Sequence, residues 1–153
     1  MNIILGVCSF FLCLVMANIM LDKHSKRAEF YRNFYNFHNT LNNEISFNQS
    51  TIKKLADKLE YKTDFEKYVK NYFDNNQQEV DYKYLDSNEQ SFLKNYFNSL
   101  GVGDKYTQLN ALNVFESEII KKKNDYSESA KKYRSVYIRL GILFGIIAFI
   151  IFI

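Results

Sequence analysis

The chain has 153 residues, of which 47% are hydrophobic and 24% charged, with two cysteines and no proline. One domain is the natural count at this length, and the apolar content argues against global disorder. The net charge of +3 is too small to indicate nucleic-acid binding. Both cysteines, Cys8 and Cys13, lie in the first apolar segment, so no disulfide framework is expected in the polar middle of the chain.

The charged residues all lie in the middle of the chain. The 20 basic and 17 acidic side chains fall between Asp22 and Arg139. Before them, residues 3–21 form an apolar run that would extend about 28 Å as a helix, close to the ~30 Å hydrocarbon thickness of a membrane. A cleaved signal peptide is the alternative, but no basic residue precedes the run and no small-residue cleavage site ends it. We therefore predict a membrane helix over residues 2–21.

A second uncharged segment covers residues 140–153. It corresponds to about 21 Å of helix, which is short for a complete span. The segment gains a further turn if Arg139 extends its side chain toward the lipid headgroups. A buried core helix is the alternative, but water would then face most of this apolar run. We predict a second membrane helix over residues 136–153.

Small residues indicate where these helices would pack. Gly141 and Gly145 have the small-xxx-small spacing that lets two membrane helices approach closely. The facing surface could be Gly6 and Ser9 of the first span or a residue of another subunit, and the sequence leaves both open.

Basic residues flank both apolar segments on the side of the polar middle. Lys26 and Arg27 follow the first segment, and Arg134 and Arg139 adjoin the second. The positive-inside rule then places residues 22–135 in the cytoplasm and both termini outside. These basic flanks are explained by topology and lipid contacts alone, whereas the acidic region between them would offer a surface to a cytoplasmic partner.

The polar middle lacks proline and strand-like alternation, so it is predicted to be helical. Apolar residues at three- and four-residue steps predict a helix over residues 24–45, which Ser46–Gln49 should end. Ser50 is a candidate N-cap of a short second helix, and Thr63–Glu66 is a capping-box pattern that would open a third.

The remaining segments continue this helical pattern. Residues 74–79 are polar and predicted to form a loop, and Ser87–Gln90 is another capping-box pattern that would open a fourth helix. Gly101 should follow that helix in a left-handed conformation. Asp104 is the candidate N-cap of a last helix, which meets no breaker before Gly141 and is expected to continue into the second span.

No group of residues typical of catalysis or metal binding is present in the sequence. His24 is expected at the membrane edge in water, and His38 packed on the apolar face of its helix. Two separated histidines and two membrane cysteines do not supply the three or four ligands of a zinc site. Gly101–Gly103 lacks the further residues of a phosphate-binding loop. We expect no catalytic residue, no metal, no cofactor and no nucleic-acid partner.

The order and spacing of these motifs resemble the stage III sporulation protein AB family along the whole chain. The most specific match is Leu-Gly-x-x-Asp-x-x-x-Gln, which contributes the structural motif residues Gly101, Gly103, Asp104 and Gln108. The closing Tyr-x-x-Leu-Gly-x-x-x-Gly contains Gly141 and Gly145, and the glycine of the first span is Gly6. The chain departs from the family after the first helix, where Asn48, Ser50 and Thr51 replace the usual Thr-Pro and glycine.

The resemblance implies an all-α fold, with a cytoplasmic helical bundle between two transmembrane helices. The bundle would be similar to the F domain of the inner-membrane platform proteins of type II secretion and type IV pilus systems. It also implies a place in the mother-cell membrane of a sporulating bacterium, in the channel complex that joins mother cell and forespore. The expected partners are a secretion-type ATPase, other stage III sporulation membrane proteins and membrane lipids, and a homo-oligomer stays open.

These implications predict a non-enzymatic scaffold that docks the ATPase to membrane components of the channel. One alternative is a platform protein of a secretion or pilus system, although such proteins usually repeat the domain that is present once here. The other alternative is a membrane-anchored helical sensor, which would need the bundle outside the cell.

Overall fold

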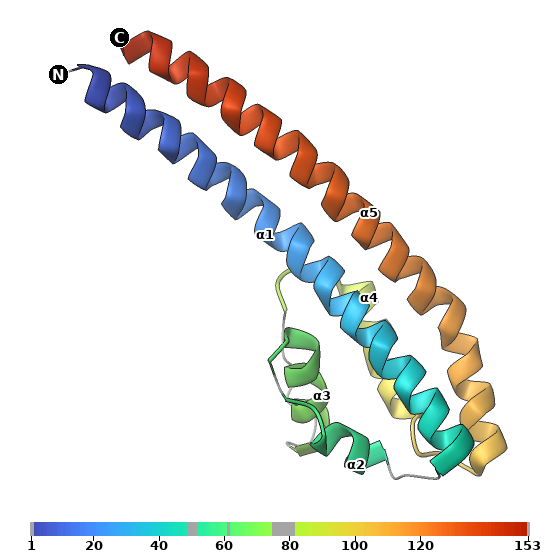
Figure 1. Cartoon of the computed structure of the whole chain (residues 1–153). Coiled ribbons are helices and arrows are strands. Elements are labelled where there is room, and N and C mark those ends of the chain that lie inside the picture. The colour runs from blue at the N-terminus through green and yellow to red at the C-terminus, as the bar shows by residue number, and fades with distance from the viewer. Residues whose placement is uncertain (1, 49–51, 61, 75–81, 153) are drawn as a thin grey trace. The chain divides into compact units, whose positions relative to one another are not determined.

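The computed structural model describes residues 2–48, 52–60, 62–74 and 82–152 (Figure 1). Every regular element in these ranges is a helix, in agreement with the all-α class that the sequence predicts. In chain order they are α1 (Asn2–Asn43), a π-helix (Glu44–Asn48), α2 (Ile52–Asp57), α3 (Asp64–Asp74), α4 (Ser87–Ser99) and α5 (Lys105–Phe152).

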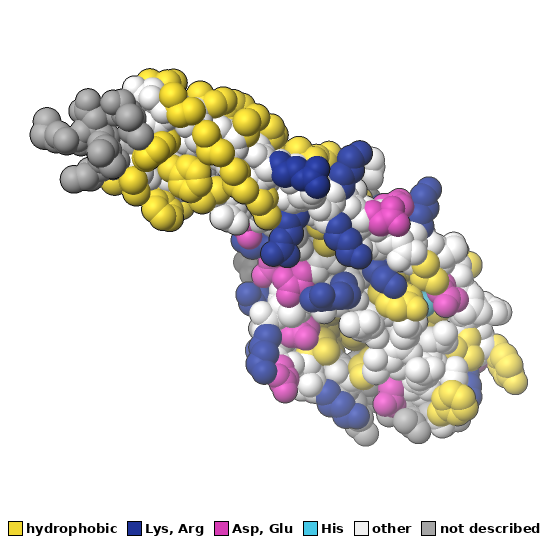
Figure 2. Space-filling model, turned by 45° about the horizontal axis from the view of Figure 1, so that its top comes forward, with side chains coloured by type: hydrophobic (Ala, Val, Ile, Leu, Met, Phe, Trp, Pro, Cys, Tyr) yellow, Lys and Arg dark blue, Asp and Glu magenta, His cyan; other side chains and the backbone are white. Residues whose placement is uncertain are grey.

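Contacts divide the chain into two units. The hairpin unit contains Met1–Ala28 and Asp125–Ile153, and the bundle unit contains Glu29–Asn124. In the hairpin unit the beginning of α1 and the end of α5 lie side by side (Figure 1). Its two apolar segments carry hydrophobic side chains on their surface (Figure 2).

The first predicted membrane segment and the first predicted polar helix are one element. α1 runs through 42 residues without interruption, since no proline or glycine falls near the expected junction at Asp22. The predicted break at Ser46–Gln49 is only partly right. The α-helix ends at Asn43, and Glu44–Asn48 continue it as a π-helix, with one more residue in each hydrogen-bonded turn.

The two capping boxes differ in how well the sequence locates them. The Glu66 amide donates to Thr63 Oγ1 at 3.3 Å and the Glu66 carboxylate accepts from the Thr63 amide at 3.2 Å, so α3 begins as predicted. At α4 the prediction is wrong by one residue, because Asp86 and not Ser87 is the N-cap. The Asp86 carboxylate accepts from the Glu89 amide at 2.9 Å, and the Glu89 carboxylate accepts from the Asp86 amide at 2.8 Å. Carboxylates form stronger bonds here than the predicted Ser and Gln side chains would.

Two further predictions concern residues that lie wholly or partly outside the described ranges. The N-cap predicted at Ser50 lies outside them. Of the predicted loop at 74–79, Asp74 is the last residue of α3 and the others lie outside the described residues.

The core of the bundle unit is built from aromatic side chains. The predicted inner face of residues 24–45 is buried as expected, with Phe34 and His38 fully enclosed. α3 contributes Phe65 and Val69, and α4 contributes Leu93, Tyr96 and Phe97, all at 1% exposure or less. α5 closes this core with two buried residues, Leu112 and Ile119, which lie on its predicted apolar stripe.

Candidate interaction surfaces

The four residues of the predicted structural motif form one turn between α4 and α5. Gly101 and Gly103 have φ angles of +76° and +83°, which favour glycine over any residue with a Cβ atom. The Asp104 carboxylate accepts a hydrogen bond from the Thr107 amide at 2.8 Å and so caps α5. Hydrogen bonds from Thr107 lower the pKa of Asp104. Gln108 Nε2 donates to the Gly103 carbonyl at 3.1 Å and closes the turn.

Three exposed apolar side chains lie in this turn or on the segments next to it, and we name them the end patch: Phe47, Val102 and Tyr106. Their exposed fractions are 83%, 60% and 78%. Lys105 Nζ donates to the Ser46 carbonyl, so the start of α5 lies beside the π-helix, and the residues that follow these two partners are Tyr106 and Phe47. The bundle unit buries most of its other rings, so an exposed aromatic pair in this place is typical of an interaction surface. Sequence periodicity could not locate it, because 59 residues separate Ser46 from Lys105.

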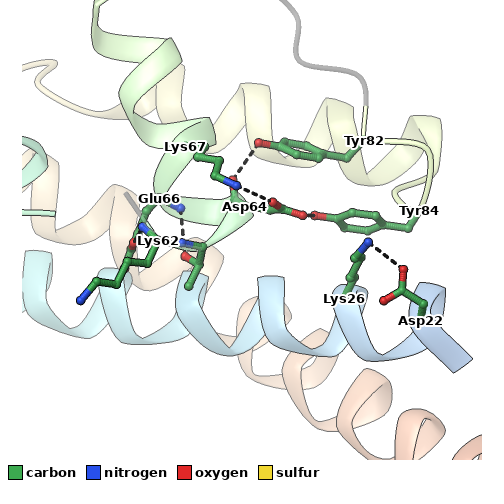
Figure 3. Close-up of polar contacts among 9 residues, drawn as sticks. Asp22, Lys26, Lys62, Asp64, Glu66, Lys67, Tyr82 and Tyr84 are labelled. Atoms are coloured by element: carbon green, nitrogen blue, oxygen red, sulfur yellow. Dashed lines mark hydrogen bonds and ion pairs between the residues drawn. The ribbon is translucent and has the colours of Figure 1, made fainter. Parts of the chain in front are cut away.

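A carboxylate on α3 anchors the segment that leads into α4 (Figure 3). The Tyr84 hydroxyl donates to Asp64 Oδ2 at 2.9 Å, and the Tyr82 hydroxyl donates to the Asp64 carbonyl at 2.8 Å. Lys67 Nζ lies 3.3 Å from Asp64 Oδ1. Burial, with the nearby Asp64 and Tyr68, raises the pKa of Tyr82 to about 12, and burial and Asp64 also raise the pKa of Tyr84. Both phenols therefore stay protonated at neutral pH, and this site is a structural anchor.

One buried histidine lies in the core of the bundle unit. His38 is fully buried, and its Nδ1 shares a hydrogen bond of 3.2 Å with the Tyr96 hydroxyl. Within the described part of the chain, Nε2 of His38 has no hydrogen-bond partner. Burial lowers the pKa of His38, and the carboxylate of Glu116 opposes that shift. The imidazole is therefore neutral at physiological pH, as a packed core histidine should be.

In the hairpin unit, two glycines of α5 lie against α1. A Cβ atom at Gly141 would lie 3.0 Å from the Cβ of Ala17, and one at Gly145 would lie 2.6 Å from Cδ2 of Phe10. Of the two surfaces that the sequence left open for these glycines, the structure therefore places them against the first apolar segment of the same chain. Gly6 belongs to α1, but its packing lies outside what the structure describes.

Of the four predicted basic flanking residues, two form contacts with other side chains and two are exposed. Lys26 forms an ion pair with Asp22 at 2.7 Å, and Arg27 donates to the Tyr126 hydroxyl at 3.0 Å with its guanidinium 4.2 Å from the ring centroid. Arg134 and Arg139 are exposed. The sequence predicts that His24 lies in water at the membrane edge. In the structure its ring stacks on Tyr133, with the ring centroids 4.0 Å apart. These contacts are ionic, hydrogen-bonded and stacking interactions within the hairpin unit.

We predict that Gly101→Ala lowers the free energy of unfolding by about 1–2 kcal/mol, the usual cost of a left-handed conformation for a residue with a Cβ atom. A new Cβ would meet Ile52 Cδ1 at an ordinary 3.8 Å, so the loss would come from the backbone and not from a clash. Gly101→Asn is the matched control and should lose less, because asparagine tolerates this conformation. Thermal unfolding followed by circular dichroism measures both, and equal stability of Gly101→Ala and wild type would contradict the prediction.

We predict that the bundle unit loses stability as pH falls below about 6.5, the ordinary pKa of histidine. The lowered pKa of His38 means that the unfolded chain binds a proton there more readily than the folded one, so acid favours unfolding. The slope should reach up to about 1.4 kcal/mol per pH unit. Denaturant unfolding between pH 5 and 7.5 measures how the free energy of unfolding changes with pH. The variant His38→Asn should flatten this slope. The control His24→Asn changes a less buried histidine and should retain most of the slope. A wild-type slope that His38→Asn leaves unchanged would contradict the prediction.

Comparison with known proteins gives a family match. The family model described as Stage III sporulation protein AB matches residues 53–153, about two thirds of the chain. These residues include the Gly101–Gln108 turn and the apolar end of α5. The chain matches no curated protein and no solved structure. For residues 1–52 the resemblance to this family stays a prediction.

Proposed function

Because the chain belongs to the stage III sporulation protein AB family, we propose that it is a non-enzymatic membrane scaffold of the channel complex between mother cell and forespore. In this role it docks a secretion-type ATPase to the membrane subunits of the complex. Two surfaces support the proposal: the exposed apolar side chains of the hairpin unit, which suit lipid, and the exposed end patch of the bundle unit, which suits a protein partner.

The observation that carries the proposal is the apolar exposure of the hairpin unit. Ile19 and Ile151 are 68% and 74% exposed, and α5 includes a segment long and apolar enough to cross a membrane. Exposing apolar surface to water is unfavourable by about 25 cal/mol per Å². Lipid around residues 2–21 and 136–153 would remove that cost, so we place both segments in the membrane. The basic flanks then put both termini outside and the bundle unit in the cytoplasm.

The continuity of the long helices fits a scaffold. α1 and α5 each contribute residues to both units, with no loop in between. Continuous helical hydrogen bonding resists bending more than a loop of the same length does. In the proposed role, the two units are joined by helix and not by loop.

The end patch is the proposed contact for the ATPase. Exposed aromatic residues are enriched among those that dominate protein–protein binding, and Phe47 and Tyr106 are the most exposed rings of the described bundle unit. Asp104 and Lys105 adjoin the patch and supply a charged rim of the kind that surrounds such contacts.

We predict that a fusion at the C-terminus reports an external location. Alkaline phosphatase joined after Ile153 should be active and green fluorescent protein at the same place dark, whereas fusions after Asn124, before the second span, should give the reverse. The reason is that residues 136–153 carry the chain across the membrane. A fluorescent C-terminal fusion would contradict the proposed topology, and release of the chain from membranes without detergent would contradict the membrane location itself.

We predict that Phe47→Ser with Tyr106→Ser weakens binding of a co-expressed secretion-type ATPase by at least about 30-fold, the size expected when one central contact is lost. Co-purification and a titration of the detergent-solubilised chain measure the change. Val114→Ser is the matched control, because Val114 is 74% exposed on α5 but lies outside the end patch. Full binding by the double variant, with its helix content intact, would remove the end patch from the proposal.

A further inference from the structure

The hairpin unit carries a strong excess of positive charge next to its apolar segments. It contains seven basic and three acidic residues, all within residues 22–28 and 125–139. One of the acidic residues, Asp22, forms an ion pair with Lys26 at 2.7 Å. At least four of the seven basic residues therefore have no acidic residue in the unit to neutralise their charge.

Five of these cations form what we name the basic collar: Lys23, Lys131, Lys132, Arg134 and Arg139. Each is exposed, and none takes part in an ion pair within the described part of the chain. Figure 2 shows Lys and Arg side chains gathered where the hydrophobic surface ends. Exposed cations without counter-ions attract a negatively charged partner.

The four collar cations on α5 lie on the side of the helix that faces away from α1. At about 100° per residue, its four cations fall within an arc of about 160°, whereas Tyr126, Tyr133 and Gly141 lie in the opposite half of the helix. That opposite half is occupied within the unit, because Arg27 contacts Tyr126 and His24 stacks on Tyr133. The collar is thus the outward face and is free to meet an external ligand.

The residues beside the collar narrow the class of ligand. Ile138 and Leu140 flank Arg139 on α5 and Leu143 follows, with exposed fractions of 38%, 39% and 53%. Nucleic acid or an acidic protein would match the charge but would leave this apolar surface in water. A phospholipid offers both an anionic phosphate and an acyl chain, and Arg134 and Arg139 can each hold a phosphate through two parallel N–H bonds.

We propose that the basic collar binds the headgroups of anionic phospholipids in the leaflet where the polar part of the chain emerges. This rests on the membrane location in the proposed function and adds a lipid preference to it. A cation close to an anionic membrane surface favours binding by about five-fold, so several together produce a marked selection of anionic over neutral lipid. Anionic lipid around α5 would hold the hairpin unit at a defined depth and rotation.

The test uses the full chain in vesicles of equal parts phosphatidylcholine and phosphatidylglycerol, extracted gently so that bound lipid co-purifies. We expect phosphatidylglycerol to be enriched over phosphatidylcholine by about five-fold or more, with less enrichment at high salt. The variant Lys131→Gln, Lys132→Gln, Arg134→Gln should lose most of this enrichment. The control Lys58→Gln, Lys83→Gln, Lys121→Gln removes the same charge from exposed positions of the bundle unit and should keep it.

Each other result overturns the proposal in a recognisable way. Equal loss in both triple variants would show that net charge acts and not the collar. Competition by soluble glycerol phosphate would show that free phosphate is the ligand. A chain that stays in the bilayer without enrichment would reject the lipid preference alone, whereas a chain that leaves the bilayer would reject the proposed function as well.

Discussion

Close packing of aromatic rings around Phe34 is the interaction on which the bundle unit depends. Its ring centroid lies 4.7 Å from that of Tyr96 and 5.2 Å from that of Phe65, so α1, α3 and α4 meet at one side chain. Each buried ring of this kind contributes roughly 1.5–3 kcal/mol by leaving water, and edge-to-face pairs add to that. The end patch depends on this core, because Phe47 and Tyr106 lie on different helices that the core packing holds together.

A core made from tyrosines needs polar partners that a leucine core would not. The hydroxyl of Tyr96 is paired with His38 and that of Tyr84 with Asp64. Leaving a buried hydroxyl without a partner costs about 1–3 kcal/mol, so these polar side chains follow from the choice of tyrosine. The buried His38 and the Asp64 anchor therefore follow from aromatic packing.

Local patterns allowed part of this fold to be predicted, because helix faces, caps and turn glycines depend on residues a few positions apart. The box at Thr63–Glu66 follows from four residues, whereas at α4 two candidate boxes are offset by one residue and the hydrogen-bond strength of Asp86 decides between them. The Asp64 anchor and the end patch could not be predicted in this way. Their members are 18 to 59 residues apart, and no periodicity within one helix reports which of two distant segments it will meet.

α5 shows how one helical period can serve three surroundings. Its inner face carries Leu112 and Ile119 in the aromatic core, then Tyr126 and Tyr133 beside Arg27 and His24, and then Gly141 and Gly145 against the apolar start of α1. The first four positions are seven residues apart and the glycines follow at steps of eight and four, so all six stay near one face while the size and polarity of the side chains change. Large apolar residues suit a thick core, tyrosines suit a polar boundary, and glycines suit two helices that must approach closely in lipid. In the proposed membrane location, such a helix would pass from water to lipid without a break, because each surrounding is matched by composition and not by a change of backbone.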